Sequence, residues 1–239
     1  MKIKLLAVFA CLWIAAACGG SALGEPMNAD ADPLRVASAM LSGAEGIAQL
    51  DAAAVAQSAA GPGLTITLDG AAAVITAVEE EAWACVGGSL RDYDNGMELF
   101  NRAALIRFLF PEFWNVQIAV GEYWLQFYET GYPMFGGSAY PYPNYCFGEF
   151  PQSFRLEANV WTYCLVAFDG DGNCRFVLWQ EGRADVQGYY ARKLMGDGDM
   201  ARMAAAGELP DWRLSVKLYA GETVQISDCT VLRFEELIQ

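Results

Sequence analysis

The part of the sequence richest in side chains that could bind a ligand is GYPMFGGSAYPYPNYCFGEFP, residues 131–151. Seven aromatic residues are interspersed there with four prolines and four glycines. Proline and glycine can hold aromatic rings as a flat apolar surface at small entropic cost, and sugar rings stack on such surfaces. Tyr140 and Tyr142 each precede a proline, which favours an extended backbone and holds the two rings apart. We therefore predict that Tyr140, Tyr142 and Tyr145 contact a ligand.

The same aromatic stretch has a second interpretation, in which its rings stabilise the protein itself. A loop of this length stays ordered by packing its own side chains, and each aromatic ring buries a large area. On this interpretation Tyr132, Phe135, Phe147 and Phe150 belong to the core. The Tyr-Pro-Tyr-Pro segment then remains as the part that could face a ligand.

A candidate calcium loop follows in DGDGNCRFVLWQ, residues 169–180. Asp169, Asp171 and Asn173 occupy its first, third and fifth places, where alternate oxygen ligands converge on one ion. The sixth place holds Cys174 where glycine is needed, and the twelfth holds Gln180 where a bidentate glutamate belongs. A hairpin turn without metal is the alternative, and calcium is the one cofactor that the sequence suggests.

The composition excludes several kinds of chemistry. The chain contains no histidine, so Ser-His-Asp and Cys-His catalysis and the common zinc and copper sites are excluded. Its formal net charge of −14 disfavours nucleic acid as a partner. A hydrolase would have to use carboxylates, and a glycosidase needs two of them flanking the cleaved bond. The spacing selects no pair among Glu122, Glu129, Glu149 and Glu157.

Five cysteines lie beyond the N-terminal segment, at positions 85, 146, 164, 174 and 229. In an oxidising compartment five cysteines form at most two disulfides, and the sequence does not give their pairing. Spacing of the CxxC type is absent, so a redox or zinc motif is not supported. The alternative is that several of these residues are small buried apolar side chains.

The N-terminus is typical of a secretory signal peptide, which we assign to residues 1–17. Lys2 and Lys4 precede an apolar run that is too short to span a bilayer as a helix. The sequence Ala15-Ala16-Ala17-Cys18 resembles the lipobox of bacterial lipoproteins, which implies that Cys18 is lipidated and anchors the chain to a membrane. Ordinary cleavage after residue 22 or 24, which would release a secreted protein, is the alternative. By the same resemblance Gly19 implies an outer-membrane or cell-surface location.

Residues 18–63 are rich in alanine and poor in large apolar side chains, which predicts a tether. A short helix is expected between Pro33 and Ala59, with Pro33 in its first turn. From residue 64 the composition changes to aromatic and β-branched residues, so residues 64–239 are assigned to one β-sandwich domain.

Alternation of apolar and polar residues predicts antiparallel strands in this domain. Hairpins are expected in LTITLDGAAAVITAV, around Asp69-Gly70, and in residues 153–182, around the DGDGN turn. A third is expected in residues 211–234, around AGET. Residues 94–110 are expected to form a short helix that leads into a strand. The fold class predicted is mainly β, an antiparallel sandwich behind a short helical or disordered tether.

The order of these segments resembles that of concanavalin-like and laminin-G-like sandwich domains, of the jelly-roll type. The resemblance covers residues 121–228 and depends on a strand in SFRLEANV, the hairpin LVAFDGDGNCRFVLW and the meander WRLSVKLYAGETVQISD. It implies a sandwich that binds ligands, often glycans and sometimes calcium, at loop ends or on a concave face. No binding residue of those domains has a diagnostic match in this sequence.

The sequence thus favours a lipid-anchored, extracytoplasmic module of the cell envelope that binds a glycan or an envelope protein without catalysis. Two alternatives stay open: a structural or interaction lipoprotein, and a carboxylate-dependent glycoside hydrolase.

Overall fold

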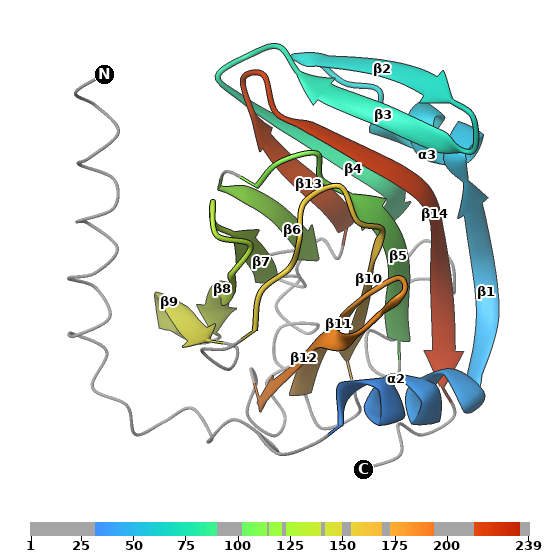
Figure 1. The fold of residues 1–239 in the computed structure, drawn as a ribbon, viewed down its shortest axis with the longest axis vertical. Coiled ribbons are helices and arrows are strands. Elements are labelled where there is room, and N and C mark those ends of the chain that lie inside the picture. The colour runs from blue at the N-terminus through green and yellow to red at the C-terminus, as the bar shows by residue number, and fades with distance from the viewer. Residues whose placement is uncertain are drawn as a thin grey trace.

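Two antiparallel β-sheets pack face to face in the computed structural model (Figure 1). It describes residues 32–89, 102–113, 115–120, 123–139, 142–149, 154–168, 173–193 and 213–234. An eight-stranded sheet has the strand order β12-β11-β10-β5-β14-β3-β2. Its eighth strand, β1, pairs with residues 228–234 of β14, beyond the part of β14 that pairs with β3. A six-stranded sheet has the order β4-β13-β6-β7-β8-β9. The fold predicted from the alternating pattern, a mainly β antiparallel sandwich, is confirmed.

The strands of the eight-stranded sheet come from both halves of the chain. They are β1 (Ala44–Asp51), β2 (Leu64–Asp69), β3 (Ala72–Ala77), β5 (Arg102–Leu109), β10 (Thr162–Phe168), β11 (Asn173–Gln180), β12 (Arg183–Lys193) and β14 (Thr223–Phe234). Those of the six-stranded sheet are β4 (Glu81–Ser89), β6 (Val116–Val120), β7 (Tyr123–Phe127), β8 (Pro133–Ala139), β9 (Tyr142–Glu149) and β13 (Arg213–Tyr219).

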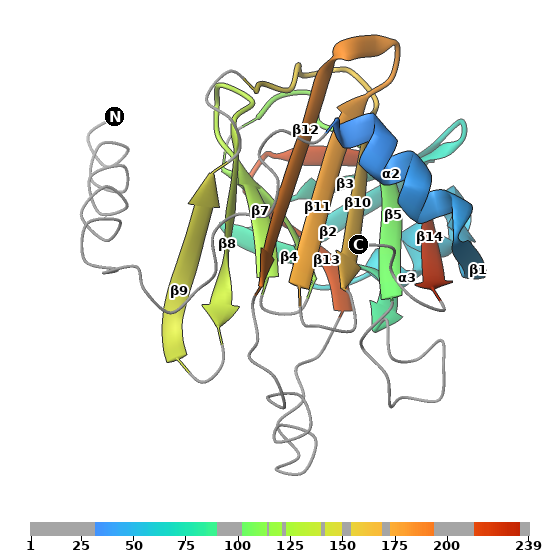
Figure 2. The ribbon, with the colours of Figure 1, turned by 90° about the horizontal axis from the view of Figure 1, so that it is seen from below.

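Two helices cover parts of the sandwich. Helix α2 (Pro33–Ser42) begins at Pro33, as expected, because the Asp32 side chain accepts hydrogen bonds from the first free backbone N–H groups of the helix. It lies across the outer face of the eight-stranded sheet (Figure 2), where Ala37 and Met40 are buried. Helix α3 (Ala52–Ala59) contacts strands of both sheets and buries Val55. Among the described residues, neither helix is long and apolar enough to cross a membrane.

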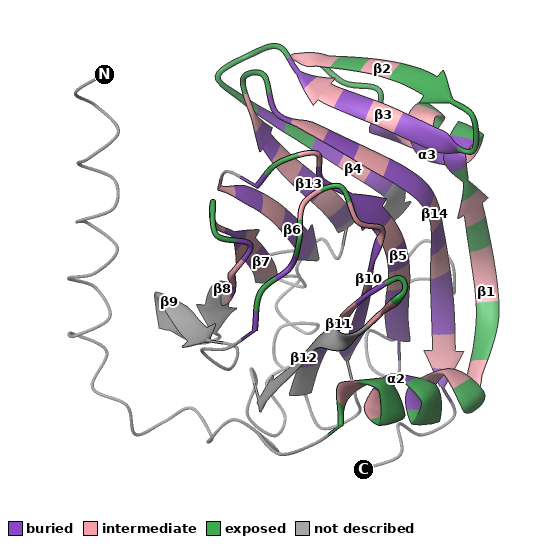
Figure 3. Cartoon of the chain, viewed as in Figure 1, coloured by how far each residue is buried: buried purple, intermediate pink, exposed green. Residues whose placement is uncertain are grey.

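The main core lies between the sheets, where buried residues recur along strands such as β3, β5 and β14 (Figure 3). Its aromatic centre is a group of four phenylalanine rings whose neighbouring centroids lie 5.1 to 6.0 Å apart: Phe108, Phe110, Phe113 and Phe127. Pairs at this separation in tilted or edge-on arrangements contribute about 1 kcal/mol each beyond their burial. A smaller cluster lies on the opposite face of the eight-stranded sheet, beneath α2.

The structure corrects the prediction that the whole of residues 18–63 is a tether. Strand β1 pairs with β14 along its length, and α3 contributes Val55 and Ala59 to the main core. The expected single helix is divided at Gly43, which follows the last residue of α2. The alanine-rich composition was misleading because small side chains suit a helix packed tightly against two sheets. The pairing of β1 depends on a strand near the other end of the chain, as in Ala44 with Phe234.

Segments of the second half also differ from prediction. Residues 154–160, the described part of the expected strand SFRLEANV, form an irregular connection with a turn in which Asn159 has φ 61°. Strands β13 and β14, expected as a hairpin in one sheet, lie in different sheets. Their turn is tied to β3 instead, since Gly221 donates a backbone hydrogen bond to Ala77 and Ala77 donates one to Glu222. Period-two patterns identify strands but do not reveal which sheet they join.

Two predicted hairpins are present. Strands β2 and β3 pair antiparallel from Leu64 with Ala77 to Asp69 with Ala72, so the two turn residues are Gly70 and Ala71. Gly70 has φ 58°, a conformation that glycine adopts at little cost. Strands β10 and β11 pair from Thr162 to Phe168, also as predicted. The strand expected in residues 94–110 is β5, and the helix expected before it falls on residues outside those described.

The cysteine positions restrict disulfide formation. Cys164 on β10 and Cys229 on β14 are both buried free thiols, and both have Ile106 of the intervening strand β5 as their register partner. Two strand spacings separate their Cα atoms by about 10 Å, whereas a disulfide needs less than about 7 Å. These two cysteines therefore cannot pair with each other, and they act as small apolar core residues.

Candidate functional site

The outer face of the six-stranded sheet carries an unusual set of side chains, which we call the glutamine–tryptophan face: Trp83, Gln117, Trp124, Gln126 and Lys217. Their neighbours in each strand are buried between the sheets, among them Ala82 and Ala84 of β4, Val216 and Leu218 of β13, Val116 and Ile118 of β6, and Leu125 and Phe127 of β7. Because successive side chains of a strand point to opposite faces, these five residues point away from the core.

Trp83 is the exposed aromatic residue of this face, with 47% of its surface accessible. The ammonium of Lys217, on the neighbouring strand, lies 5.4 Å from the Trp83 ring and 5.2 Å from the Tyr219 ring. Lys217 Nζ also pairs with a carboxylate oxygen of Glu81 at 2.8 Å. Burial lowers the pKa of Lys217, but the hydrogen bond to Glu81 and the neighbouring Tyr219 raise it by more, so the ammonium stays charged.

Two glutamines continue the face from Lys217. Gln117 on β6 is the register partner of Lys217 on one side and of Gln126 on the other. Both glutamines are half-buried. Among the residues that the structure describes, no hydrogen bond engages the side-chain amide of Gln117 or of Gln126. Each amide therefore offers two N–H donors and one carbonyl acceptor to whatever lies above the sheet.

The indole of Trp124 completes the face. It lies directly over Gly136 of β8, its register partner, so closely that a Cβ atom at Gly136 would be 2.1 Å from the ring. Only glycine leaves room for this arrangement. Trp124 and Gln126 lie two residues apart on the same face of β7, which places an aromatic ring beside the uncommitted amides.

The side chains of this face are of the types that bind a ring-shaped, hydroxyl-rich molecule. Aromatic surface accepts the apolar face of such a molecule, and amides exchange hydrogen bonds with its hydroxyl groups. Within the described part of the chain, no group of three or more acidic, cysteine or histidine side chains could hold a metal ion.

A second cluster lies on the outer face of the eight-stranded sheet, beside the area that α2 covers. Its centre is Arg107 of β5, whose guanidinium carbon lies 4.2 Å from the ring of Trp161 and 5.7 Å from that of Tyr163. The ring of Tyr163 stacks on Trp179, with centroids 5.1 Å apart and planes 9° apart. We call these four residues, with the carboxylate of Glu181, the arginine ladder.

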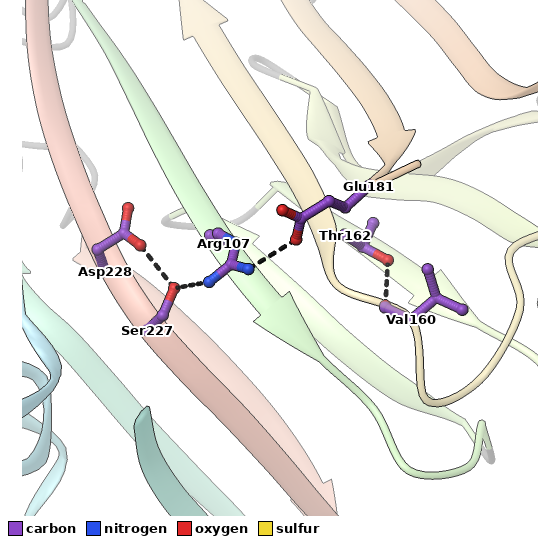
Figure 4. A network of polar contacts seen from close by, with 6 residues as sticks. All are labelled: Arg107, Val160, Thr162, Glu181, Ser227 and Asp228. Atoms are coloured by element: carbon purple, nitrogen blue, oxygen red, sulfur yellow. Dashed lines mark hydrogen bonds and ion pairs between the residues drawn. The ribbon is translucent and has the colours of Figure 1, made fainter. Parts of the chain in front are cut away.

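Polar contacts hold the arginine ladder in place (Figure 4). Arg107 Nη2 donates to Glu181 Oε2 at 2.6 Å, and Nη1 donates to Ser227 Oγ at 3.1 Å. Ser227 Oγ in turn donates to Asp228 Oδ2 at 2.5 Å. Burial lowers the pKa of Arg107, but Glu181 and Tyr163 together raise it by more, so the net shift of this pKa is upward.

The position of Ser227 follows from an irregularity in β14. The pairing with β5 shifts between Ile226 and Asp228, so Ser227 is the extra residue of a bulge. The contacts of Arg107 consequently join β5, β14 and the turn that follows β11.

We interpret the arginine ladder as a group that stabilises the fold rather than as a ligand-binding surface. Tyr163 lies between Arg107 and Trp179, and Trp161 is covered by the guanidinium, so the ring faces already have partners within the protein. Stacking of a ligand needs an uncovered ring face. Trp83, in contrast, retains almost half of its surface, which makes the glutamine–tryptophan face the better candidate.

The residues predicted from the sequence are only partly within the described structure. Residues 131–151 were expected to form a long loop, but β8 and β9 make a hairpin at the edge of the six-stranded sheet. Tyr142 and Tyr145 belong to β9, although their side chains lie outside the described residues, as does Tyr140. Tyr132, expected in the core, packs partly buried against it and lies 4.4 Å from the guanidinium of Arg155.

The other predicted sites remain predictions. Cys18, Asp169 and Asp171 lie outside the described residues, and Asn173 begins β11 with its side chain also outside them. The sequence reasoning missed Trp83, Gln117 and Gln126. A signal for the glutamines existed, because VQIAV and YWLQF place single polar residues in apolar strands. Strands β6 and β7 follow each other in the chain, but β4 and β13 are distant from them, so the adjacency of Trp83 and Lys217 to the glutamines could not be seen.

Comparison with known proteins bears on the fold alone. No protein-family model matches the chain, and no curated protein matches it. A solved structure of a protein of unknown function from Shewanella oneidensis MR-1 superposes with a TM-score of 0.51 at 10% identity, over 80% of this chain and 87% of that one. This likeness agrees with the concanavalin-like sandwich predicted from the order of the strands.

Weaker likenesses include two carbohydrate-active proteins. A carbohydrate-binding module of a Ruminococcus gnavus sialidase, bound to sialyllactose, has a TM-score of 0.42 at 10% identity, over 82% of this chain and 95% of that one. A laminarinase catalytic domain from Thermotoga petrophila RKU-1 has a TM-score of 0.41 at 10% identity, over 74% and 82%.

Proposed function

We propose that this protein is a non-catalytic glycan-binding module, and that the glutamine–tryptophan face holds the ligand. The observation that carries the proposal is the exposed ring of Trp83 in line with two half-buried glutamine amides that have no hydrogen-bond partner among the described residues. Such amides can exchange hydrogen bonds with water for hydrogen bonds with the hydroxyl groups of a ligand. Both requirements, a ring face and uncommitted amides, are met on the same sheet face.

The predicted ligand-binding tyrosines are compatible with this location. The hairpin of β8 and β9, which bears Tyr142 and Tyr145, forms the edge of the same six-stranded sheet. We propose that Tyr140, Tyr142 and Tyr145 extend the binding surface at that edge. A calcium ion at Asp169, Asp171 and Asn173 would lie in the turn between β10 and β11, which belong to the other sheet.

Replacing Trp83 by alanine tests the binding proposal. Truncating a tryptophan that is a hot spot of a binding surface commonly costs about 2 kcal/mol, which is roughly a thirtyfold loss of affinity. We expect Trp83→Ala to lose retention in affinity electrophoresis on the polysaccharides that retard the parent protein. Its thermal unfolding should change little, because the ring is 47% exposed.

The matched control removes an exposed apolar side chain from the other sheet. Leu68 on β2 is 57% exposed, so Leu68→Ala should retain full binding. If the parent protein binds no glycan on an array of plant, algal, bacterial and host polysaccharides, the structural or interaction lipoprotein becomes the better assignment. Unchanged retention of Trp83→Ala would remove the glutamine–tryptophan face from consideration.

We further propose that Cys18 carries a lipid that anchors the module at the outer membrane or cell surface, as the N-terminal residues suggest. Lipidation of the cysteine would leave residues 19–31 as a link between the membrane and α2. Changing Cys18→Ser should release the protein from the membrane fraction or stop its processing. A variant that matures and fractionates like the parent would refute the anchor.

A further inference from the structure

The glutamine–tryptophan face contains a straight row of side chains that crosses the strands. Direct register partners connect Trp83 to Lys217, Lys217 to Gln117, and Gln117 to Gln126. Neighbouring strands lie about 4.8 Å apart, so the row from Trp83 to Gln126 spans roughly 14 Å. That length exceeds one sugar ring, and it runs at right angles to the strands.

The groups in the row differ in what they offer. Trp83 at one end provides an exposed ring, whereas Gln117 and Gln126 at the other end provide amides without partners among the described residues. A single sugar on Trp83 would not reach Gln126. The amides therefore become useful only to a ligand that continues past Lys217.

The charges along the row oppose an acidic ligand. The ammonium of Lys217 is already paired with Glu81 at 2.8 Å, and its side chain is only 14% exposed. The two amides are neutral, and the chain as a whole has a formal net charge of −14. Like-charge repulsion suppresses binding of an anionic partner, and no uncommitted cation of the row offsets it.

We infer that the row binds a linear, neutral polysaccharide laid across the strands, with one sugar ring stacked on Trp83 and later sugars hydrogen-bonded to Gln117 and Gln126. This inference rests on the proposed function and adds to it the class of the ligand and its direction. Affinity should accordingly increase with the number of sugars until the row is filled, and then stay constant.

Calorimetric titration with oligosaccharides of defined length tests the inference on the purified protein. The probes are the cello- and laminari-oligosaccharides from disaccharide to hexasaccharide, and oligogalacturonates of the same lengths as the acidic counterpart. We expect one neutral series to bind with affinity that rises with chain length, and the acidic series to bind at least about tenfold more weakly at low salt. Equal affinity for disaccharide and hexasaccharide, or tighter binding of the acidic series, would overturn the inference.

Gln126→Ala separates this inference from the function on which it depends. Losing the hydrogen bonds of one amide should weaken hexasaccharide binding about three- to tenfold and leave disaccharide binding unchanged. Gln225→Ala is the control, since Gln225 is a half-buried glutamine on β14 of the other sheet. If binding requires Trp83 but Gln126→Ala has no effect on the hexasaccharide, only the row is refuted. If none of these oligosaccharides binds and the polysaccharide array also gives no hit for the parent protein, both the row and the glycan-binding function are refuted.

Discussion

Glu222 is a buried carboxylate at the point where the chain passes from β13 to β14, and its ionisation should govern the pH dependence of stability. Only 6% of its surface is exposed. Its Oε2 atom accepts a hydrogen bond of 2.7 Å from the backbone N–H of Tyr219, while Oε1 has no partner among the described residues. Burial raises the pKa of Glu222 from an ordinary 4.5 to about 7; the Tyr219 hydrogen bond opposes this shift and the charge of Glu112 adds to it.

The sign of the effect follows from the direction of the pKa shift. Below pH 4.5 the carboxyl is protonated in both folded and unfolded chains and has no differential effect. Between pH 4.5 and about 7 the unfolded chain releases the proton while the folded chain keeps it, so stability falls as pH rises. A shift from 4.5 to about 7 corresponds to about 3 kcal/mol of stability lost by pH 8, at 1.36 kcal/mol per pH unit.

Glu222→Gln tests this reasoning because glutamine has the shape of the protonated acid and cannot ionise. Urea unfolding followed by tryptophan fluorescence gives the free energy of unfolding of both proteins across the pH range. We expect the variant to gain about 3 kcal/mol on the parent between pH 4.5 and pH 8. Glu112→Gln should reduce that pH dependence, because it removes a neighbouring charge. A difference between Glu222→Gln and parent that does not change with pH would refute the assignment.

Three further predictions test other parts of the structure. Gly131→Ala should destabilise the fold by more than Gly182→Ala, as measured by urea unfolding. Both glycines have φ near +70°, but only at Gly131 would a Cβ atom lie 2.0 Å from a backbone carbonyl oxygen. Arg107→Ala should cost about 1–2 kcal/mol of stability without loss of glycan retention, and the opposite result would make the arginine ladder the binding site. Burial raises the pKa of both Cys164 and Cys229, so these thiols should react with a thiol reagent only after unfolding, and rapid labelling of the native protein would contradict their placement.

Local sequence patterns were sufficient wherever a structural feature depends on neighbouring residues. The start of α2 at Pro33, the turn at Gly70 and the pairing of β10 with β11 all follow from residues a few positions apart. Each depends on a cap, a backbone angle or a short connection, and these are properties of the residue types themselves. The absence of histidine likewise excludes whole classes of catalysis without any structure.

Features that depend on distant residues were missed for a common reason. The alanine-rich α3 has little apolar area of its own, and it is buried because strands of both sheets pack around it. Residues 154–160 have the composition of a strand, yet none of the described strands pairs with them. A strand is stable only when its backbone groups find partners, and those partners are selected by the whole fold.

The candidate site shows the same division between local and tertiary information. Alternation in β6 and β7 determines that Gln117 and Gln126 point to the opposite side from Ile118 and Leu125, and this can be read from the sequence by itself. The order β4-β13-β6-β7 decides that Trp83, Lys217 and the two glutamines form one row, and this order joins segments more than 100 residues apart, as in Trp83 with Lys217. Side-chain direction is a property of the local backbone, whereas adjacency across a sheet results from long-range pairing, which only the tertiary structure decides.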